Sequence, residues 1–411
     1  MHVDHFPRFL QSTFRSQQKF FSKIGFTHFQ FLIVAMLVNA RPAKLSHLSR
    51  AIPGQGHRTS LARFLQSDWD ESGMLAAQAE RIIRQMNPGR NEVVYLIIDD
   101  TRIKKRGKKM AGVSKLWDKK SHAYIHGHIV VSAAIQFRGV TIPWAIELWM
   151  PKVQAGSGYR KLTQMASELI QRFPVLCGLK VRVLFDAAYL AVNVVKACEA
   201  RNFTWFSVAA RNRKIIRRGK KTPIRDLAPG VLRYHGQRVR LQRSRGWRWM
   251  RIASVVGTLG KTGEVRLVVS KRAGPSSKEL LSVVTNELDM KPRDVIVTYE
   301  KRWSIEVLFK DLRNTLGLGE YQVLSRTAIE RHLHLSCAAH QTLTHQAIKE
   351  EGAQAKQKDK DVALPPLTQQ LHDLRQRVNR DRIDRLLNRT RNKKLKSRIR
   401  QYLLQESPVA A

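Results

Sequence analysis

Short apolar runs recur in the middle of the chain. Residues 93–98, 181–185 and 203–208 are rich in β-branched and aromatic side chains, which is typical of buried strands. Two further apolar runs flank an Arg-Gly dipeptide and predict a hairpin over residues 129–149. Amphipathic helices are predicted between these strands, at residues 159–173 and 187–200. The alternation of strands and helices predicts an α/β core.

The pattern differs on both sides of this block. Residues 1–88 have apolar positions near helical spacing and predict a small helical bundle. The stretch after the core is β-rich and reads as an inserted, mostly antiparallel subdomain, with strands at 233–241, 249–258, 265–271 and 280–285. The predicted domains are 1–88 (helical, DNA-binding), 89–210 (core, first part), 211–290 (β-rich insertion), 291–350 (core, second part) and 351–411 (basic helical tail).

A charged stripe lies on the helix predicted for residues 299–313. Tyr299, Arg302, Glu306 and Arg313 fall within about 60° of one another at 3.6 residues per turn. A carboxylate surrounded by cations contributes little stability by itself. A metal ion would bind the carboxylate, and a phosphate backbone would bind the cations. On this segment alone, an amphipathic helix with a solvated charged face is the simpler interpretation.

Net charge indicates the partner. The chain has 411 residues with 74 Lys+Arg and 32 Asp+Glu, a net charge of +42 that points to a polyanion. At 43% hydrophobic residues, the chain is not a disordered basic tail. No apolar run is long enough to cross a bilayer, so no membrane partner is predicted. Three isolated cysteines without CxxC spacing favour a reducing cytoplasm.

Three carboxylates stand out by their positions in the predicted elements. Asp99-Asp100 follows the first buried strand, Asp186 follows the strand at 181–185, and Glu306 is on the charged helix. Adjacent strand residues face opposite sides, so only one of Asp99 and Asp100 can easily point into a site. Three acids of this kind can hold two Mg²⁺ ions for phosphoryl chemistry, with Mn²⁺ as a substitute. A strand-terminal Asp that only caps a helix is the alternative for each.

Together these residues resemble a DDE transposase of a bacterial insertion sequence, from the group with a Tyr-Arg-Glu-Lys signature. The resemblance is carried by Asp100 in Asp-Asp-Thr, by Asp186 in Leu-Phe-Asp, and by Tyr299-x2-Arg302-x3-Glu306. It implies a ribonuclease H-like catalytic core interrupted by the β-insertion, with helical N- and C-terminal regions. It also implies that Asp100, directly before Thr, is the catalytic acid of the pair. The final signature position, usually Lys, is Arg313 here.

The resemblance further implies DNA contacts around the acids. Tyr299, Arg302 and Arg313 would position phosphates, with Lys310 competing for the role of Arg313. Trp303 or Trp144 would stack an extracted base, the alternative for each being a place in the core. Independently of the resemblance, the basic loop that contains Lys104, Lys105 and Arg106 is expected to touch phosphates.

The function predicted from the sequence is therefore DNA transposition. The protein would hydrolyse the phosphodiester at the ends of its element and join the 3′ ends to target DNA, by a cut-and-paste route. Its partner is double-stranded DNA, it would act as a homodimer on DNA, and it would reside in the bacterial cytoplasm with the nucleoid. A ribonuclease H-like nuclease without strand transfer, or a non-catalytic DNA-binding protein, are the alternatives.

Overall fold

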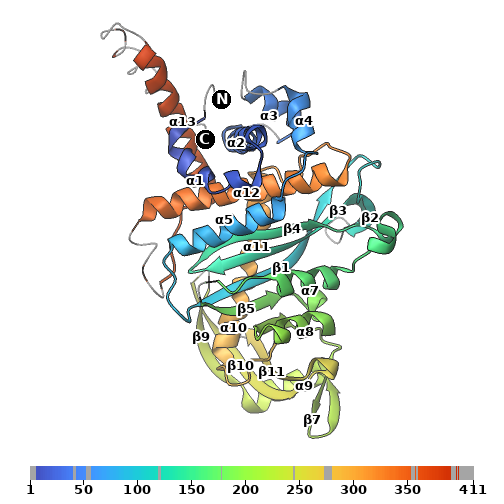
Figure 1. Cartoon of the computed structure of the whole chain (residues 1–411). Coiled ribbons are helices and arrows are strands. Elements are labelled where there is room, and N and C mark those ends of the chain that lie inside the picture. The colour runs from blue at the N-terminus through green and yellow to red at the C-terminus, as the bar shows by residue number, and fades with distance from the viewer. Residues whose placement is uncertain are drawn as a thin grey trace. The chain divides into compact units, whose positions relative to one another are not determined.

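The computed structural model describes most of the chain (Figure 1). The described residues are 6–39, 43–51, 57–118, 122–176, 178–243, 246–272, 280–352, 357, 360–389, 395 and 397. The chain divides into two compact units, one of Met1–Gln78, Asp311–Ala355 and Leu364–Ala411, the other of Ala79–Lys310 and Lys356–Ala363. No described helix has the length and apolar character needed to span a membrane.

The first unit is helical. Its elements are α1 (Gln11–Arg15), α2 (Lys23–Val38), α3 (Leu45–Ala51), α4 (Arg58–Phe64), the start of α5 (Glu71–Gln85), the end of α11 (Ser304–Asn314), α12 (Arg326–Glu351) and α13 (Leu367–Arg389), with 3₁₀ turns at Arg8–Leu10 and Gln18–Phe20. The last ten residues of α2 (FQFLIVAMLV) are almost all buried, and α2 packs against α12. A helix that is apolar all round belongs inside a core, so α2 and α12 form the centre of this unit.

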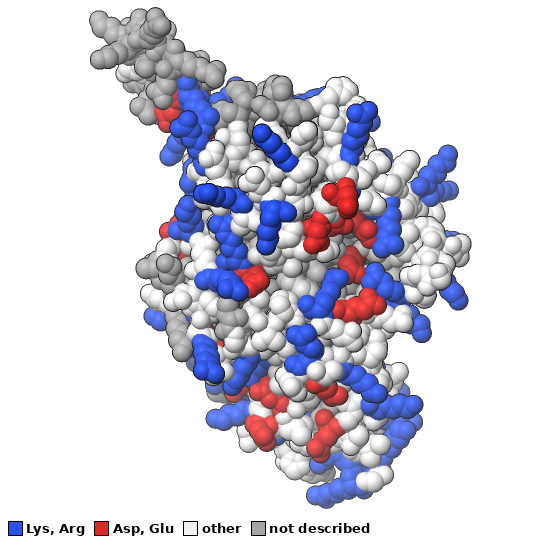
Figure 2. Space-filling view, viewed as in Figure 1, with Lys and Arg blue, Asp and Glu red and all other residues white. Residues whose placement is uncertain are grey.

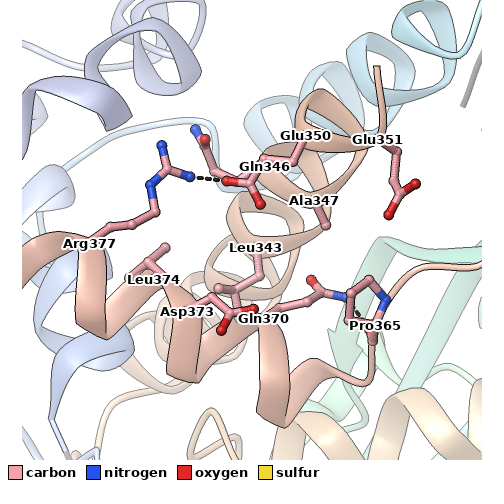
Figure 3. A pocket seen from close by; sticks show the side chains of 10 residues that line it. All are labelled: Leu343, Gln346, Ala347, Glu350, Glu351, Pro365, Gln370, Asp373, Leu374 and Arg377. Carbon is pink, nitrogen blue, oxygen red and sulfur yellow. Dashed lines mark hydrogen bonds and ion pairs between the residues drawn. The ribbon is translucent and has the colours of Figure 1, made fainter. Parts of the chain in front are cut away.

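The region predicted as a basic tail contributes to that core. On α13, Leu371, Leu374 and Val378 are buried, and Arg375 donates hydrogen bonds to backbone carbonyls at the end of α2. Figure 3 shows a small pocket between α12 and α13, where Arg377 forms an ion pair with Glu350. The helix begins at Leu367, and most of the tail after residue 389 lies outside the described residues.

The second unit is built on a 12-stranded sheet in the order β2-β3-β1-β5-β6-β12-β11-β10-β7-β8, with β4 on β3 and β9 on β10. The strands are β1 (Val93–Lys104), β2 (Ser114–Asp118), β3 (Ala123–Phe137), β4 (Val140–Leu148), β5 (Lys180–Phe185), β6 (Thr204–Val208), β7 (Lys214–Arg217), β8 (Lys220–Pro223), β9 (Gln237–Arg243), β10 (Gly246–Thr258), β11 (Glu264–Arg272) and β12 (Leu280–Thr285). β1, β5 and β6 are parallel, and β3 is antiparallel to both β1 and β4. This is the ribonuclease H-like arrangement, so the predicted fold class is confirmed.

The predicted hairpin is β3–β4, and its turn is part of a buried ion pair. Arg138 has φ of 44°, as a tight hairpin turn requires. Its guanidinium donates to Glu92 at 2.6 and 3.1 Å and to the Met86 carbonyl at 2.8 Å. The Arg138 and Glu92 side chains are 4% and 5% exposed, so breaking the pair would leave a buried charge.

Helices cover the sheet. Figure 1 shows α7 (Leu162–Arg172) and α8 (Val192–Ala200) side by side, and they contact β3 and β6 respectively. α6 (Lys152–Ala155) precedes them, and α10 (Pro292–Glu300) packs on β6, β12, β11 and β10. These positions follow from their amphipathic sequences; on α7, for example, Met165, Leu169 and Ile170 are buried.

The insertion between β6 and α10 is β-rich as predicted, but it begins with a helix that sequence patterning did not reveal. Residues Ile224–His235 form α9, which buries Ile224, Val231 and Leu232 despite containing Pro229. The predicted strand at 233–241 consequently starts only at Gln237. β12 then pairs with both β11 and β6, which joins the insertion to the core sheet.

The charged helix predicted over residues 299–313 is interrupted. α10 ends at Glu300, a 3₁₀ turn spans Lys301–Trp303, and α11 begins at Ser304. Each 3₁₀ residue turns the chain by about 120° instead of 100°. The interruption therefore rotates Glu306 and Arg313 relative to Tyr299. The angle of about 60° that was predicted for one continuous helix does not hold.

Candidate functional site

Asp99 and Asp100 lie within β1, not at its end as predicted. β1 continues to Lys104 because it pairs with β3 as far as Lys104 and Gly127. Its parallel pairing with β5, however, stops at Ile98 and Phe185. The two acids therefore come directly after the point where β1 and β5 separate, which is where a parallel sheet opens a space for ligands.

Asp186 stands at the same level of the sheet. It follows the last residue of β5 and begins the 3₁₀ turn Ala187–Tyr189 without capping it through its side chain. The Ser207 hydroxyl on β6 donates to the Asp186 backbone carbonyl at 3.3 Å, which fixes the backbone and leaves the carboxylate to the site. The negative charge of Asp186 contributes to a raised pKa at both Asp99 and Asp100.

Arg302 connects β1 to α11. Its Nη1 donates to Asp99 Oδ2 at 2.7 Å, and its Nη2 donates to Glu306 Oε1 at 2.5 Å. The Arg302 and Asp99 side chains are only 14% and 17% exposed, which shields the bond between them from water, whereas Glu306 is 35% exposed. Two of the three predicted acidic positions are thereby brought to one guanidinium, although their residues are separated by about 200 positions in the sequence.

Burial has the largest effect on the pKa of the two β1 acids, Asp99 and Asp100. Burial raises the pKa of Asp99 to about 6, against the opposing effect of Arg302, while Asp100 and Asp186 raise it further. Burial likewise raises the pKa of Asp100, and the hydrogen bond from Tyr189 opposes that rise. Carboxyl groups whose pKa is raised by burial and by neighbouring negative charge are typical of functional sites.

Tyr189 is a site residue that the sequence did not reveal. Its hydroxyl donates to Asp100 Oδ1 at 3.0 Å, and the residue is 1% exposed. Burial, followed by the charge of Asp100, raises the pKa of Tyr189, so the phenol keeps its proton. Its position three residues after Asp186 was visible in the sequence, but nothing in the pattern separated it from a core tyrosine.

Asp99 and Asp100 face different neighbours because consecutive strand residues point to opposite sides. Asp99 faces Arg302, which also binds Glu306, whereas Asp100 faces Tyr189. Asp186, at the end of the adjacent strand, interacts with both. The arrangement thus brings the predicted acids together around the end of β5 while dividing them between two faces of β1.

The aromatic residues predicted to contact DNA differ in how deeply they are buried. Tyr299 is 7% exposed, its pKa is raised by burial, and the Arg302 guanidinium lies 5.9 Å from its ring centre. Trp303 is 63% exposed, whereas Trp144 is 4% exposed and packs edge-on against Phe173, a place in the core.

The predicted cations also differ in exposure. Lys104, Arg106 and Lys310 are exposed, while Lys105 is buried. Arg313 is exposed and belongs to the helical unit, whereas Lys310 belongs to the sheet unit. On the face shown in Figure 2, basic side chains are spread widely and acidic ones gather in smaller groups between them.

The acids provide oxygen ligands of the kind that Mg²⁺ and Mn²⁺ prefer. Among the described residues, no three His, Cys, Asp or Glu side chains converge closely enough to hold a metal ion as they stand. Glu306 is held by Arg302, while the negative charge of Asp186 contributes to raising the pKa of both Asp99 and Asp100. A divalent cation would offset this repulsion, so the donor set fits such an ion chemically.

Comparison with known proteins identifies the family of the chain. The family model described as "DDE superfamily endonuclease" matches residues 19–258, and the model described as "Archaeal putative transposase ISC1217" matches residues 260–348. The chain is 25% identical over 314 residues to the "Probable transposase for insertion sequence element IS701" of Microchaete diplosiphon, covering 74% of this chain and 79% of that protein.

DDE superfamily endonucleases act on DNA and generally use divalent metal ions. The first family model spans more than half of the sequence, including both β1 acids and Asp186, and the second spans Glu306. The chain therefore belongs to the DDE superfamily endonucleases, as a DDE transposase of an insertion sequence.

Proposed function

We propose that this transposase moves its element by a cut-and-paste route. Water attacks the phosphodiester at an element end, which releases a 3′-hydroxyl and a 5′-phosphate. The 3′-hydroxyl then attacks a phosphodiester of target DNA, so that a new P–O bond forms as the target strand's 3′ oxygen leaves. The observation that carries this proposal is the meeting of the β1 acids, Asp186 and Glu306 around the end of β5.

Asp100, Asp186 and Glu306 are proposed as the catalytic acids and the ligands of two Mg²⁺ ions. The bound ions would supply Lewis acidity to the attacking and leaving oxygens. The chain's own residues prepare the site: Tyr189 orients Asp100, and Arg302 keeps Glu306 beside β1. Asp99 is the alternative to Asp100, because it shares Arg302 with Glu306.

DNA would approach this site over cations and aromatic side chains. Arg302 uses two N–H groups on carboxylates, and a guanidinium has five, so donors remain for a phosphate. We assign DNA contacts to the residues Arg302, Trp303, Lys310, Arg313, Lys104 and Arg106; Tyr299 and Lys105, also expected to contact DNA, are buried and are not assigned a direct contact. The helical region 1–88 and the basic tail 351–411 are proposed to bind DNA as well, with two copies of the chain acting together on the two element ends.

The test uses a linear duplex that carries the terminal inverted repeats, incubated with Mg²⁺ and a supercoiled target. Strand-transfer product supports the proposal, whereas cleavage without joining supports a nuclease. Asp100→Asn, Asp186→Asn and Glu306→Gln should each abolish cleavage while the duplex is still bound. If Asp100→Asn cleaves at the wild-type rate and Asp99→Asn does not cleave, Asp99 is the catalytic acid. If Glu306→Gln cleaves normally, the three-acid assignment is wrong.

A further inference from the structure

A two-stranded ribbon of the insertion carries an exposed ladder of arginine and tryptophan. Trp247 and Trp249 on β10 are 52% and 47% exposed. The Arg240 guanidinium lies 5.1 Å from the Trp247 ring centre, and that of Arg238 lies 4.7 Å from the Trp249 ring centre. These four residues are referred to as the Arg–Trp ladder. None of them belongs to the acidic site, and the sequence patterning did not single them out.

Strand register explains why the ladder forms. Arg240 is opposite Trp249 in the β9–β10 pairing, yet its guanidinium lies over Trp247, the diagonal neighbour. Arg238 reaches Trp249 diagonally in the same sense. Guanidinium and indole therefore alternate along one face of the ribbon, as diagonal pairs within reach of long side chains allow. The opposite face holds Leu241, Met250 and Ile252 in the core, which fixes the ladder on the solvent side.

The charge of this segment is one-sided. Between Leu227 and Arg251 the sequence has seven arginines and no Asp or Glu. Arg238 is directly opposite Arg251, and like charges opposite each other destabilise a strand pair. Within the described part of the chain, no ion pair involves Arg238 or Arg240. Two large exposed rings beside uncompensated cations cost stability, and an anionic partner would remove that cost.

We propose that the Arg–Trp ladder binds the sugar–phosphate backbone of duplex DNA outside the catalytic site. A guanidinium stacked on an indole keeps its in-plane N–H groups available for bidentate bonds to phosphate, and the ring limits the conformational entropy that binding would remove. The indoles thus position the guanidiniums. This proposal rests on the proposed function, which places DNA at the acidic site.

The sheet gives the distance between the two contacts. From β5, which ends at Asp186, the order to β10 passes β6, β12 and β11, so β10 is the fourth strand away. The ladder is also displaced along the strands, because the pairings from β5 to β10 align the level of Asp186 with Ser254, and Trp249 and Trp247 lie five and seven residues away from Ser254 on β10. At about 4.8 Å per strand and about 3.4 Å per residue, the indoles lie about 25–30 Å from the acids. One strand of duplex DNA advances about 3.4 Å per nucleotide, so a duplex at the acidic site would reach the ladder about eight base pairs from the scissile phosphate.

The first experiment measures the salt dependence of binding. The full-length protein is titrated in EDTA onto a fluorescein-labelled duplex carrying the terminal repeat, at several salt concentrations, by fluorescence anisotropy. Arg238→Gln with Arg240→Gln should lower the slope of log K against log salt by about 1.8, because each lost phosphate contact removes about 0.9. Binding at low salt should weaken about tenfold. Lys220→Gln with Lys221→Gln, two exposed cations on β8, is the charge-matched control.

The outcomes separate this proposal from the proposed function. An unchanged slope in the arginine variant, with wild-type DNA binding, overturns the ladder alone, and so does an equal loss in the lysine control. Wild-type protein that binds no duplex overturns the proposed function itself. Trp247→Leu with Trp249→Leu should weaken duplex binding less than loss of both arginines. A loss seen only with single-stranded DNA would instead mean that bases stack on the indoles, and would overturn backbone binding.

A second experiment needs no variant. Phosphates of the terminal-repeat duplex are ethylated at random, and wild-type protein is used to select the molecules that still bind. Ethylation should interfere at phosphates near the cleavage site and again about eight base pairs away. Interference confined to the cleavage site would overturn the proposal.

Discussion

Replacing Asp99 would measure how much this buried carboxylate lowers the free energy of unfolding. Burial raises the pKa of this carboxyl from 3.8 to about 6. The folded state therefore holds its proton more tightly than the unfolded state, and stability falls as pH rises from about 4 to about 6. The difference between 3.8 and about 6 corresponds to about 3 kcal/mol, and burial has this effect even though Arg302 opposes it. Asp99→Asn should then stabilise the protein by about 3 kcal/mol above pH 7 and by nothing below pH 4.

The assay is thermal unfolding of wild type and variant between pH 4 and pH 8, without divalent ions. For a unit of this size, about 3 kcal/mol corresponds to roughly 6 °C at pH 8, with the two curves converging at pH 4. Asp226→Asn, a change at an exposed side chain, is the control and should show no such trend. A variant that is less stable than wild type at pH 8 would show that the Arg302 ion pair outweighs burial, and the reasoning would fail.

Three further predictions follow from contacts within the fold. Tyr189→Phe removes the hydroxyl that lowers the pKa of Asp100, so the acid limb of the cleavage-rate profile should move to higher pH; an unmoved limb would contradict a role for Tyr189. Arg138→Met should destabilise the protein by about 3–5 kcal/mol in urea unfolding by leaving Glu92 charged and buried, and adding Glu92→Leu should restore much of that loss. Gly317→Ala should cost about 1–3 kcal/mol, because φ is +68° and the new Cβ would lie 2.4 Å from that of a neighbouring alanine; an unchanged melting temperature would refute this.

The sequence predicted the strands and the acids of the core for one physical reason. Residues 181–185 and 93–98 are short, apolar and β-branched, and such runs have few alternatives to a buried strand. The position of Asp186 follows from that directly. The hairpin was equally predictable because Arg138-Gly139 takes positive φ at both residues, as a tight turn needs.

The remaining features depend on tertiary contacts that local patterning does not contain. Residues 99–104 are polar enough to suggest a loop, and only the pairing with β3 extends β1 through them. The segment with Pro229 and Gly230 carries strong helix-breaking signals, yet packing of Ile224 and Val231 holds it as α9. Tyr189 acquires its role from Asp100, a residue 89 positions away.

The join between β12 and β6 has a consequence for how this protein can be shortened. Three residue pairs connect the strands, and Asn286 and Glu287 add bonds to Trp205 and Arg182. Without the insertion, β6 would present an unpaired strand edge, a template for aggregation. The insertion is therefore not a detachable module. A truncated protein would lose its solubility before its catalysis could be measured, and the role of the insertion has to be studied with point substitutions.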